Sequence, residues 1–535
     1  MNRVLLLGLD GADPALCRRW MDDGVLPNLR ALAAAGALLP LESVTPPATF
    51  PAWTTCVTGV NPGRHGVFDF TEMVPGRYAV RFVNGSFRRA PAVWDVLSRA
   101  GRRVVVAGVP ATWPPEPVNG LMLSGFDSPV ATSVDASFVY PRARAAEAAG
   151  WRFADFQEGH IGPGWHAEAL RRLLRGIEAK ERILLNWART EPWDFFMAVF
   201  GESDTVSHHF WMFHDPQSPR YPGPNPFSDA IRDVYARLDA AVGRLVDAAG
   251  PDTLVMVVSD HGFTGAGTTV VHLNNRLAEM GLLRYLPGGG RDSLLKRLGL
   301  SVVPERARGA LFRRLRGVAG GAESRSRFGG LDWANTRAYS EELGYFPSVR
   351  VNLRGRDPQG TVAPEDYDTF VAELCARLRE WDVIADAVPR ARLYNGAHVD
   401  RAPDVVLSLK AERGYAPVCV RARSGGAVRT LTEAEYPGGK ERGMNGVHRN
   451  PGVLAVNRPV VAGGPERPSL LDIAPTVLSA LGVTGPDMEG RPLFAPGPRT
   501  ADTPPADGGD GNARPYSPEE EALLEERLRS LGYLE

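Results

Sequence analysis

Short runs of apolar residues recur along the chain and alternate with longer amphipathic patterns. The runs are continuous, which is typical of strands covered on both faces of a sheet. They predict strands at residues 4–9, 104–109, 195–200, 254–258, 405–409 and 453–456. Amphipathic stripes predict helices at about 229–249 and 167–188, and five prolines predict a loop over 210–227. This alternation favours an α/β fold with a mostly parallel central sheet and helices on both faces.

Acidic residues follow three of the predicted strands. Asp10 comes directly after the first strand, Asp260 follows the strand at 254–258, and Asp204 follows the strand at 195–200 after a short gap. Ligand sites in open α/β sheets lie beyond the carboxyl ends of the strands. We therefore expect the three carboxylates to meet at one edge of the sheet.

Histidines accompany these acids. His208 is four residues after Asp204, so one helical turn would place both side chains on the same face. His261 follows Asp260 where the chain can turn at a glycine, and His448 precedes the strand predicted at 453–456. Mixed carboxylate and imidazole donors of this kind can bind divalent metals.

A threonine adds a candidate nucleophile to this set. Thr49 lies in the segment Ala48-Thr49-Phe50-Pro51, ahead of a helix that we expect to begin near Pro51. A threonine hydroxyl is a poor nucleophile at neutral pH unless a metal lowers its pKa. A helix N-terminus beside it would direct backbone N–H groups at a phosphate. The pattern thus indicates metal-assisted transfer or hydrolysis of a phosphoryl group.

The spread of these residues bears on domain organisation. The chain has 535 residues, enough for several domains. Residues 10 and 448 cannot share a site if they fold independently, so we predict one catalytic domain over 1–495 with insertions. An arginine-rich insertion at about 275–335, richest over 287–330, is either a lid over an anionic substrate or a solvated surface excursion.

The last forty residues differ in composition from the rest. Residues 496–515 are rich in Pro, Gly and Asp and predict a disordered linker. A capping box and an apolar leucine stripe predict a helix over 516–535. This helix docks either on its own domain or on a second subunit, which would form a homo-oligomer.

Charge and cysteine usage narrow the class of protein. The net charge of −1 gives no reason to expect a nucleic-acid partner. Four cysteines without paired spacing favour a reducing compartment. The N-terminal apolar run is too short for a signal peptide, and no run is long enough to span a membrane. We therefore expect a soluble cytoplasmic protein that acts on a small-molecule phosphate ester.

Taken together, the motifs resemble the alkaline phosphatase superfamily, and most closely its type I phosphodiesterase/nucleotide pyrophosphatase branch. The resemblance runs in the family's order over about residues 4–493. It is carried by Gly8-Leu9-Asp10-Gly11, Leu26-Pro27-Asn28-Leu29, Thr49-Phe50-Pro51, Thr58-Gly59-Val60-Asn61-Pro62-Gly63-Arg64-His65-Gly66, Asp204 to His208, Ser259-Asp260-His261-Gly262, His448 and Asp472-Ile473-Ala474-Pro475.

This resemblance implies an alkaline phosphatase-like fold with inserted cap or lid segments, and two divalent metal ions. Zinc is usual in the family, and some branches use manganese or magnesium. One ion would be bound by Asp204, His208 and His448. The other would be bound by Asp10, Thr49, Asp260 and His261, with Thr49 as the nucleophile that forms a covalent phosphothreonine.

The chain departs from the family at the phosphate-binding position. Nucleotide pyrophosphatases carry an asparagine shortly after the stretch that matches 58–66, and here this position falls at Phe70, beside Asp69. Nucleotide substrates are therefore in doubt. Arg64 and Arg449 are candidates to supply positive charge instead, or are surface residues. We expect His65 to be a structural turn residue and His209 to point away from the metal.

Alternative functions remain at this point. A phosphomutase of the same superfamily would need a lid that retains substrate, and a non-catalytic metal-binding scaffold would keep only a relict site. A sulfatase would need Cys or Ser ahead of Pro-Ser-Arg, whereas Cys56 is followed by Val57-Thr58. The leading hypothesis is a metal-dependent hydrolase of phosphodiesters or phosphomonoesters.

Overall fold

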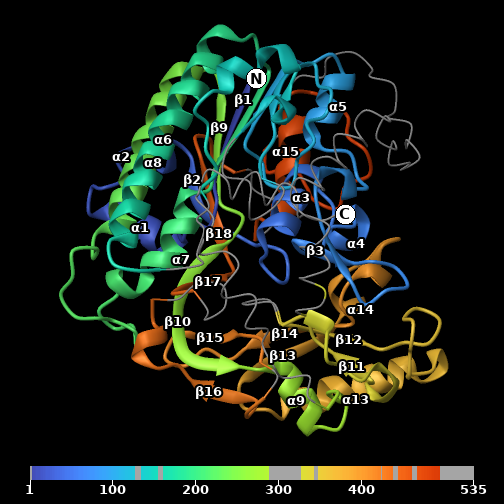
Figure 1. Cartoon of the computed structure of the whole chain (residues 1–535). Helices are drawn as coiled ribbons and strands as arrows, with labels where there is room; N and C mark the ends of the chain where they lie inside the picture. Colours follow the sequence, from blue (N-terminus) through green and yellow to red (C-terminus); the bar gives the residue numbers. More distant parts are fainter. Residues whose placement is uncertain are drawn as a thin grey trace.

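An eight-stranded sheet lies at the centre of the computed structural model (Figure 1). Its order is β2-β18-β9-β1-β8-β5-β6-β7. The strands are β1 (Val4–Leu9), β2 (Ala37–Leu41), β5 (Val104–Ala107), β6 (Gly120–Leu123), β7 (Val139–Tyr140), β8 (Phe195–Phe200), β9 (Leu254–Val258) and β18 (Gly452–Val456). From β9 to β6 all neighbours are parallel, and β18 and β7 run antiparallel to theirs. The mostly parallel sheet predicted from the sequence is confirmed.

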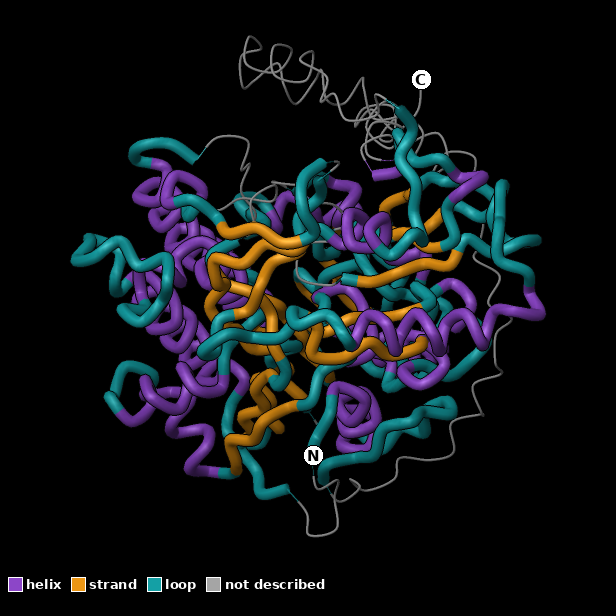
Figure 2. Tube along the Cα trace, turned by 90° about the horizontal axis from the view of Figure 1, so that it is seen from below, coloured by secondary structure: helices purple, strands orange, loops and turns teal. Residues whose placement is uncertain are grey.

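Helices cover both faces of this sheet (Figure 2). On β1, Leu5, Leu7 and Leu9 pack on one face, and Val4 and Leu6 pack on the other. The first face is covered by α1 (Pro14–Asp22), α2 (Pro27–Ala35), α6 (Trp165–Thr190), α7 (Glu202–His214) and α8 (Ala230–Ala249). The second face is covered by α3 (Thr49–Thr58), α5 (Val93–Arg99) and α15 (Ile473–Ala480).

Two smaller sheets lie beyond the carboxyl ends of the central strands (Figure 1). The first contains β10 (Gly262–Val271), β15 (Ala416–Cys419), β16 (Val428–Thr430) and β17 (Gly446–Arg449). The second has the order β11-β12-β14-β13, with β11 (Ala338–Tyr339), β12 (Ser348–Val351), β13 (Ile384–Pro389) and β14 (Val405–Leu409). Helices α9 (Leu273–Glu279) and α13 (Tyr367–Arg379) pack with this second sheet. The prediction that 405–409 belongs to the parallel sheet is wrong, because β14 is antiparallel to both neighbours.

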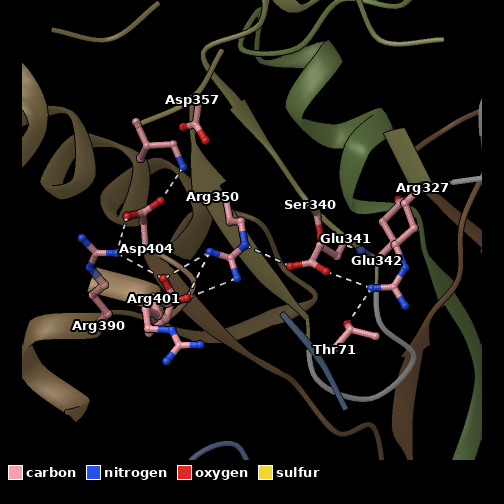
Figure 3. A network of polar contacts seen from close by, with 12 residues as sticks. Thr71, Arg327, Ser340, Glu341, Glu342, Arg350, Asp357, Arg390, Arg401 and Asp404 are labelled. Carbon is pink, nitrogen blue, oxygen red and sulfur yellow. Dashed lines mark hydrogen bonds and ion pairs between the residues drawn. The ribbon is translucent and has the colours of Figure 1, made fainter. Parts of the chain in front are cut away.

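A hairpin of β3 (Thr71–Met73) and β4 (Val80–Phe82) contacts the region of this second sheet. Buried Arg350 donates to Glu341 at 2.9 Å, and Glu341 also pairs with Arg327 at 2.8 Å (Figure 3). Arg327 in turn donates to the Thr71 hydroxyl at 3.0 Å. The ring of Tyr78 stacks on Trp333 with a centroid separation of 3.5 Å. The hairpin is thus held to the second sheet by polar and aromatic contacts.

The structure describes residues 3–126, 134–154, 161–287, 324, 327–342, 347–422, 424–437, 444–460 and 467–494. The predicted linker at 496–515, the predicted helix at 516–535 and most of the arginine-rich segment 287–330 lie outside these residues, and the division into domains stays a prediction. The predicted loop at 210–227 is wrong for its first residues, because α7 continues to His214 and the prolines begin only at Pro216. Among the described helices, none is long and apolar enough to cross a membrane.

Candidate metal centre

The three acids predicted to meet follow three adjacent strands. The sheet order places β9, β1 and β8 side by side, and Asp10 directly follows β1. Asp260 is two residues beyond the end of β9. Asp204 lies in the first turn of α7, which begins two residues after β8. The carboxyl ends of these parallel strands bring residues 10, 204 and 260 to one edge of the sheet.

Asp204, His208 and His448 form the first group of potential ligands, with donor atoms that all lie within 4.8 Å of one another. Asp204 Oδ1 is 3.4 Å from His208 Nε2 and 3.1 Å from His448 Nε2. The two Nε2 atoms are 2.9 Å apart. The predicted helical turn at Asp204–His208 exists, and β17 delivers His448 to it from the far end of the chain.

Asp10, Asp260 and His261 form the second group, again with donor atoms within 4.8 Å of one another. His261 Nε2 is 3.5 Å from Asp10 Oδ1 and 3.4 Å from Asp260 Oδ2. All three residues are buried. The two groups are adjacent, because His261 Nε2 is 4.0 Å from Asp204 Oδ1 and its ring stacks on that of His448 at 3.6 Å.

Hydrogen bonds fix which nitrogen of each histidine faces the acids. The Nδ1 atoms of His208, His448 and His261 lie 2.8, 2.9 and 3.1 Å from the carbonyl oxygens of residues 446, 47 and 262. A carbonyl can only accept, so each Nδ1 carries a proton, and in the neutral imidazole each Nε2 then offers a lone pair. Metal-binding histidines are commonly oriented in this way by a backbone carbonyl.

Several buried atoms of the two groups have no hydrogen-bond partner within the described parts of the chain. They are Asp10 Oδ1, Asp204 Oδ1, Asp260 Oδ2 and His261 Nε2. Buried polar atoms without partners are rare and costly. The four atoms are carboxylate oxygens and an imidazole nitrogen, which face one another and can all donate an electron pair. A cation bound between them would supply the missing partner. The residues present therefore fit two divalent ions.

The titration of the acids is shaped by this crowding. Burial, followed by the charges of Asp260 and Asp204, raises the pKa of Asp10 well above its ordinary value. Burial and the charge of Asp204 likewise raise the pKa of Asp260. Burial opposes ionisation of Asp204 too, but His208 and His448 hold its pKa well below the usual range. Burial and His448 lower the pKa of His261. Divalent cations would favour the ionised acids.

Thr49 is the first residue of α3 and is buried. The chain on either side of it contacts both groups. Two residues earlier, the Pro47 carbonyl accepts from His448 of the first group, and one helical turn later, Trp53 Nε1 donates to Asp10 Oδ2 of the second at 3.0 Å. Residues 49 and 53 share a helix face. Trp53 is also part of the buried core, and its spacing from Thr49 is the sequence signal that indicates its contact with the site.

The other candidate residues have different roles. Arg64 pairs with Asp487 at 3.0 Å, and Arg449 pairs with Asp13 at 2.7 Å, so both guanidinium groups contact acids of the protein. His65 is buried and shares a 2.9 Å hydrogen bond with Thr55, consistent with its expected structural role. His209 contacts the ring of Trp165.

Phe70, the residue at which the resemblance places the phosphate-binding asparagine, has an aromatic side chain. The Phe70 ring packs against Phe50, next to Thr49, with a centroid distance of 4.4 Å. The Phe126 ring also packs against Phe50, with a centroid distance of 5.3 Å. Phe50 is buried, whereas Phe70 and Phe126 are only partly buried. Phe50, Phe70 and Phe126 therefore form an apolar wall that begins at the residue after the predicted nucleophile.

Solved structures define the class of fold. Phosphonoacetate hydrolase from Sinorhizobium meliloti 1021, in complex with phosphonoformate, is 17% identical and superposes with a TM-score of 0.50 over 88% of this chain and 94% of its own. Murine ectonucleotide pyrophosphatase/phosphodiesterase 5 is 13% identical, with a TM-score of 0.47 over 91% of this chain and 97% of its own. The first match shows an alkaline phosphatase-like fold. No curated protein matches the chain.

A family model gives the narrower assignment. The model of type I phosphodiesterase/nucleotide pyrophosphatase matches residues 4–419. The chain therefore belongs to this family and is a hydrolase of phosphoric ester bonds. The matched range contains every candidate ligand except His448, which the structure brings to the other two members of its group.

Proposed function

We propose that the protein hydrolyses a small-molecule phosphate ester through a covalent phosphothreonine on Thr49, with two divalent ions bound by the two groups described above. The observation that supports this proposal most strongly is the convergence of three carboxylates and three imidazoles at the contacts of Pro47 and Trp53, on either side of the N-terminus of α3. Ions bound there would lower the pKa of the Thr49 hydroxyl and neutralise charge that develops on the phosphoryl oxygens.

In this mechanism the hydroxyl oxygen of Thr49 bonds to phosphorus while the bond to the leaving oxygen breaks. The proton that the hydroxyl loses passes through solvent to that oxygen, which leaves as an alcohol. A water molecule then cleaves the phosphothreonine, which returns the hydroxyl and releases phosphate or a phosphomonoester. Trp53 holds Asp10 in place through its indole N–H. The N-terminal turn of α3 directs backbone N–H groups toward the anion.

Zinc is the metal that we propose, with manganese or magnesium as alternatives. Each group offers imidazole nitrogen together with carboxylate oxygen. This mixture suits zinc better than magnesium, which prefers oxygen ligands. The two groups contribute three carboxylates in total, so two divalent ions would leave a net positive charge of about one for an anionic substrate.

The wall formed by Phe50, Phe70 and Phe126 bears on the substrate. The partly exposed rings of Phe70 and Phe126, which pack on Phe50, offer contact area for an apolar or aryl ester group, and Phe70 has no amide to hold a phosphoryl oxygen. We propose a phosphodiester or monoester with such a group, and expect poor activity on nucleotides. A screen of both ester classes with zinc and with manganese tests this directly.

The decisive variant is Thr49→Ala. It should abolish turnover of a chromogenic phosphodiester while both metal ions remain bound, because the remaining ligands are unchanged. Thr58→Ala is a matched control on the same helix, since the Thr58 hydroxyl bonds only the Thr54 carbonyl at 2.7 Å in the described structure. Undiminished activity of Thr49→Ala would remove this residue from the nucleophile role.

Measuring product identity separates the hydrolase from the phosphomutase. Release of alcohol supports hydrolysis, whereas formation of a phosphate isomer supports a mutase; no contact of the described residues favours the mutase. A cytoplasmic location stays a prediction. So does a homo-oligomer formed through the C-terminal helix, which lies outside the described residues.

A further inference from the structure

Helix α7 and strand β17 together carry the first ligand group, and they contact each other directly. The backbone N–H of Asn445 donates to the His208 carbonyl at 2.8 Å. The next carbonyl, that of Gly446, accepts from His208 Nδ1, also at 2.8 Å. A methyl group at residue 446 would lie 2.3 Å from the Ser207 carbonyl oxygen. Glycine at this position therefore allows β17 to lie against α7.

A buried arginine holds this junction from the other side. Arg220 comes from the loop after α7 and is 1% exposed. Its Nε and Nη2 donate to the Gly267 carbonyl of β10 at 2.9 and 2.6 Å. Its Nη1 donates to the Met444 carbonyl at 3.2 Å and to Asn445 Oδ1 at 3.3 Å. The guanidinium thus joins β10 to the segment that leads into β17.

Asn445 completes the connection to α7. Its side-chain nitrogen donates to the His209 carbonyl at 3.4 Å, and its carbonyl accepts from Ala266 of β10 at 2.7 Å. The same side-chain nitrogen also donates to the Pro437 carbonyl at 3.2 Å. Asn445 is therefore held by α7, β10, Arg220 and Pro437. Because Asn445 directly precedes β17 and His448 lies three residues later within that strand, a shift of Asn445 would move His448 relative to Asp204 and His208.

A buried guanidinium is costly, and burial lowers the pKa of Arg220 to about 10. Fold stability alone could require it, as for Arg350, which is also buried but pairs with Glu341 in the second small sheet (Figure 3). The two arginines differ in what they touch. Arg350 contacts none of the proposed ligand segments in the described structure, whereas Arg220 contacts the residue that bridges α7 and β17.

We propose that Arg220 and Asn445 are positioning residues that set the distance between α7 and β17, and thereby the affinity of the Asp204–His208–His448 group for its metal ion. The proposal rests on the proposed two-metal function of the site. Groups that orient metal ligands typically change affinity by about 10- to 100-fold when they are removed.

Cobalt titration of the metal-free full-length protein tests this, because Co²⁺ bound by nitrogen and oxygen ligands absorbs in the visible range. The wild type should bind two ions. The absorption that is lost in His448→Ala belongs to the first group, which contains that histidine. Arg220→Met should lower the cobalt affinity of the first group about 10- to 100-fold. The cobalt affinity of the second group should change less than about threefold. In the His448→Ala background, Arg220→Met should have no further effect on the remaining site.

Arg350→Met is the matched control. It removes a buried arginine from another part of the fold, so it should lower the unfolding midpoint while both cobalt affinities stay unchanged. If Arg220→Met does not fold, two milder variants answer the same question. Arg220→Lys keeps the charge but loses the planar fork, and Asn445→Ala keeps the main-chain bonds; each should weaken the first group selectively.

The inference would be overturned if folded Arg220 and Asn445 variants lowered the cobalt affinity of both groups equally, or changed the affinity of neither group. Either outcome would leave the two-metal proposal intact. A wild type that binds no pair of cobalt ions would overturn the two-metal proposal and this inference with it. Weakening in Arg350→Met as large as in Arg220→Met would also overturn it, since the effect would then follow from general destabilisation.

Discussion

At the residue scale, the contact between Trp53 and Asp10 joins the nucleophile helix to the second ligand group. The indole is completely buried, and its N–H donates to a carboxylate oxygen that is buried as well. This hydrogen bond also favours the ionised form of Asp10, because it opposes the rise in pKa that burial causes.

Trp53→Phe removes that donor and keeps most of the packing. We expect a loss of about 1–3 kcal/mol in unfolding free energy, because a buried acceptor loses its partner. The pKa of Asp10 should rise further, so metal binding should weaken at mildly acidic pH. Urea unfolding and zinc titration at pH 6 and 8 check both effects, and an unchanged variant would show that the indole does not hold Asp10.

Asp69 gives a pH-dependent prediction. Burial raises the pKa of Asp69 to about 7. The hydrogen bond from the Phe70 N–H partly opposes this rise, and the charge of Glu341 adds to it. The folded-state pKa exceeds that of an unfolded aspartate, about 3.9. Its contribution to stability is therefore complete below about pH 4 and is lost as the pH rises through about 7.

Asp69→Asn should abolish this loss. Between pH 5 and pH 8, the wild type should lose about 1 kcal/mol or more of unfolding free energy that Asp69→Asn keeps. Denaturant unfolding at the two pH values measures it. Asp368→Asn, at an exposed position of α13, provides the baseline. A parallel shift of Asp69→Asn and wild type with pH would contradict the prediction.

At the element scale, the sequence predicts the strands that carry the site better than the strands around it. The runs at 4–9, 195–200 and 254–258 match β1, β8 and β9 residue for residue, because these strands are buried on both faces. Strand β10 gave no such run, since it is rich in glycine and threonine. Strand β14 has the same apolar character as β1, and composition does not tell to which sheet a strand belongs.

For the candidate site, the proximity of the proposed ligands to one another was predictable, because the motifs lie at strand ends. The contacts that hold these groups in place were not predictable from the sequence. Arg220 lies in a segment whose prolines indicate only a loop, and its partners Gly267 and Asn445 are distant in sequence. Such contacts depend on tertiary packing and leave no local pattern.

The packing of α3 on β1 also belongs to this scale. A methyl group on Gly8 would lie 2.4 Å from Trp53 Cη2 and 2.8 Å from Val199 Cγ2. Gly8→Ala should therefore displace α3, with a cost of about 1–3 kcal/mol and a fall in kcat through the shift of Thr49. Gly426→Ala, where the nearest atom is 3.7 Å away, should change little. Thermal unfolding and kinetics of both variants test this, and an unaffected Gly8→Ala would show that α3 tolerates displacement.

At the scale of the whole molecule, the proposed ligands come from segments that span almost the entire chain. Metal ions bound by them would connect the central sheet, α7 and β17. Removal of metal with EDTA should lower the unfolding midpoint, and zinc should restore it. A site at a free ion concentration 100-fold above its Kd contributes about 2.7 kcal/mol. A midpoint that does not respond to EDTA or zinc would argue against tight metal binding.

The sheet order has a consequence for synthesis of the protein on the ribosome. Strand β18, near the end of the described chain, inserts between β2 and β9, two strands that are made much earlier. Until residues 452–456 have emerged, β9 is an open edge of apolar residues, of the kind that recruits other chains. Prematurely terminated copies should therefore aggregate, and a nascent chain would remain dependent on chaperones until its last central strand is in place.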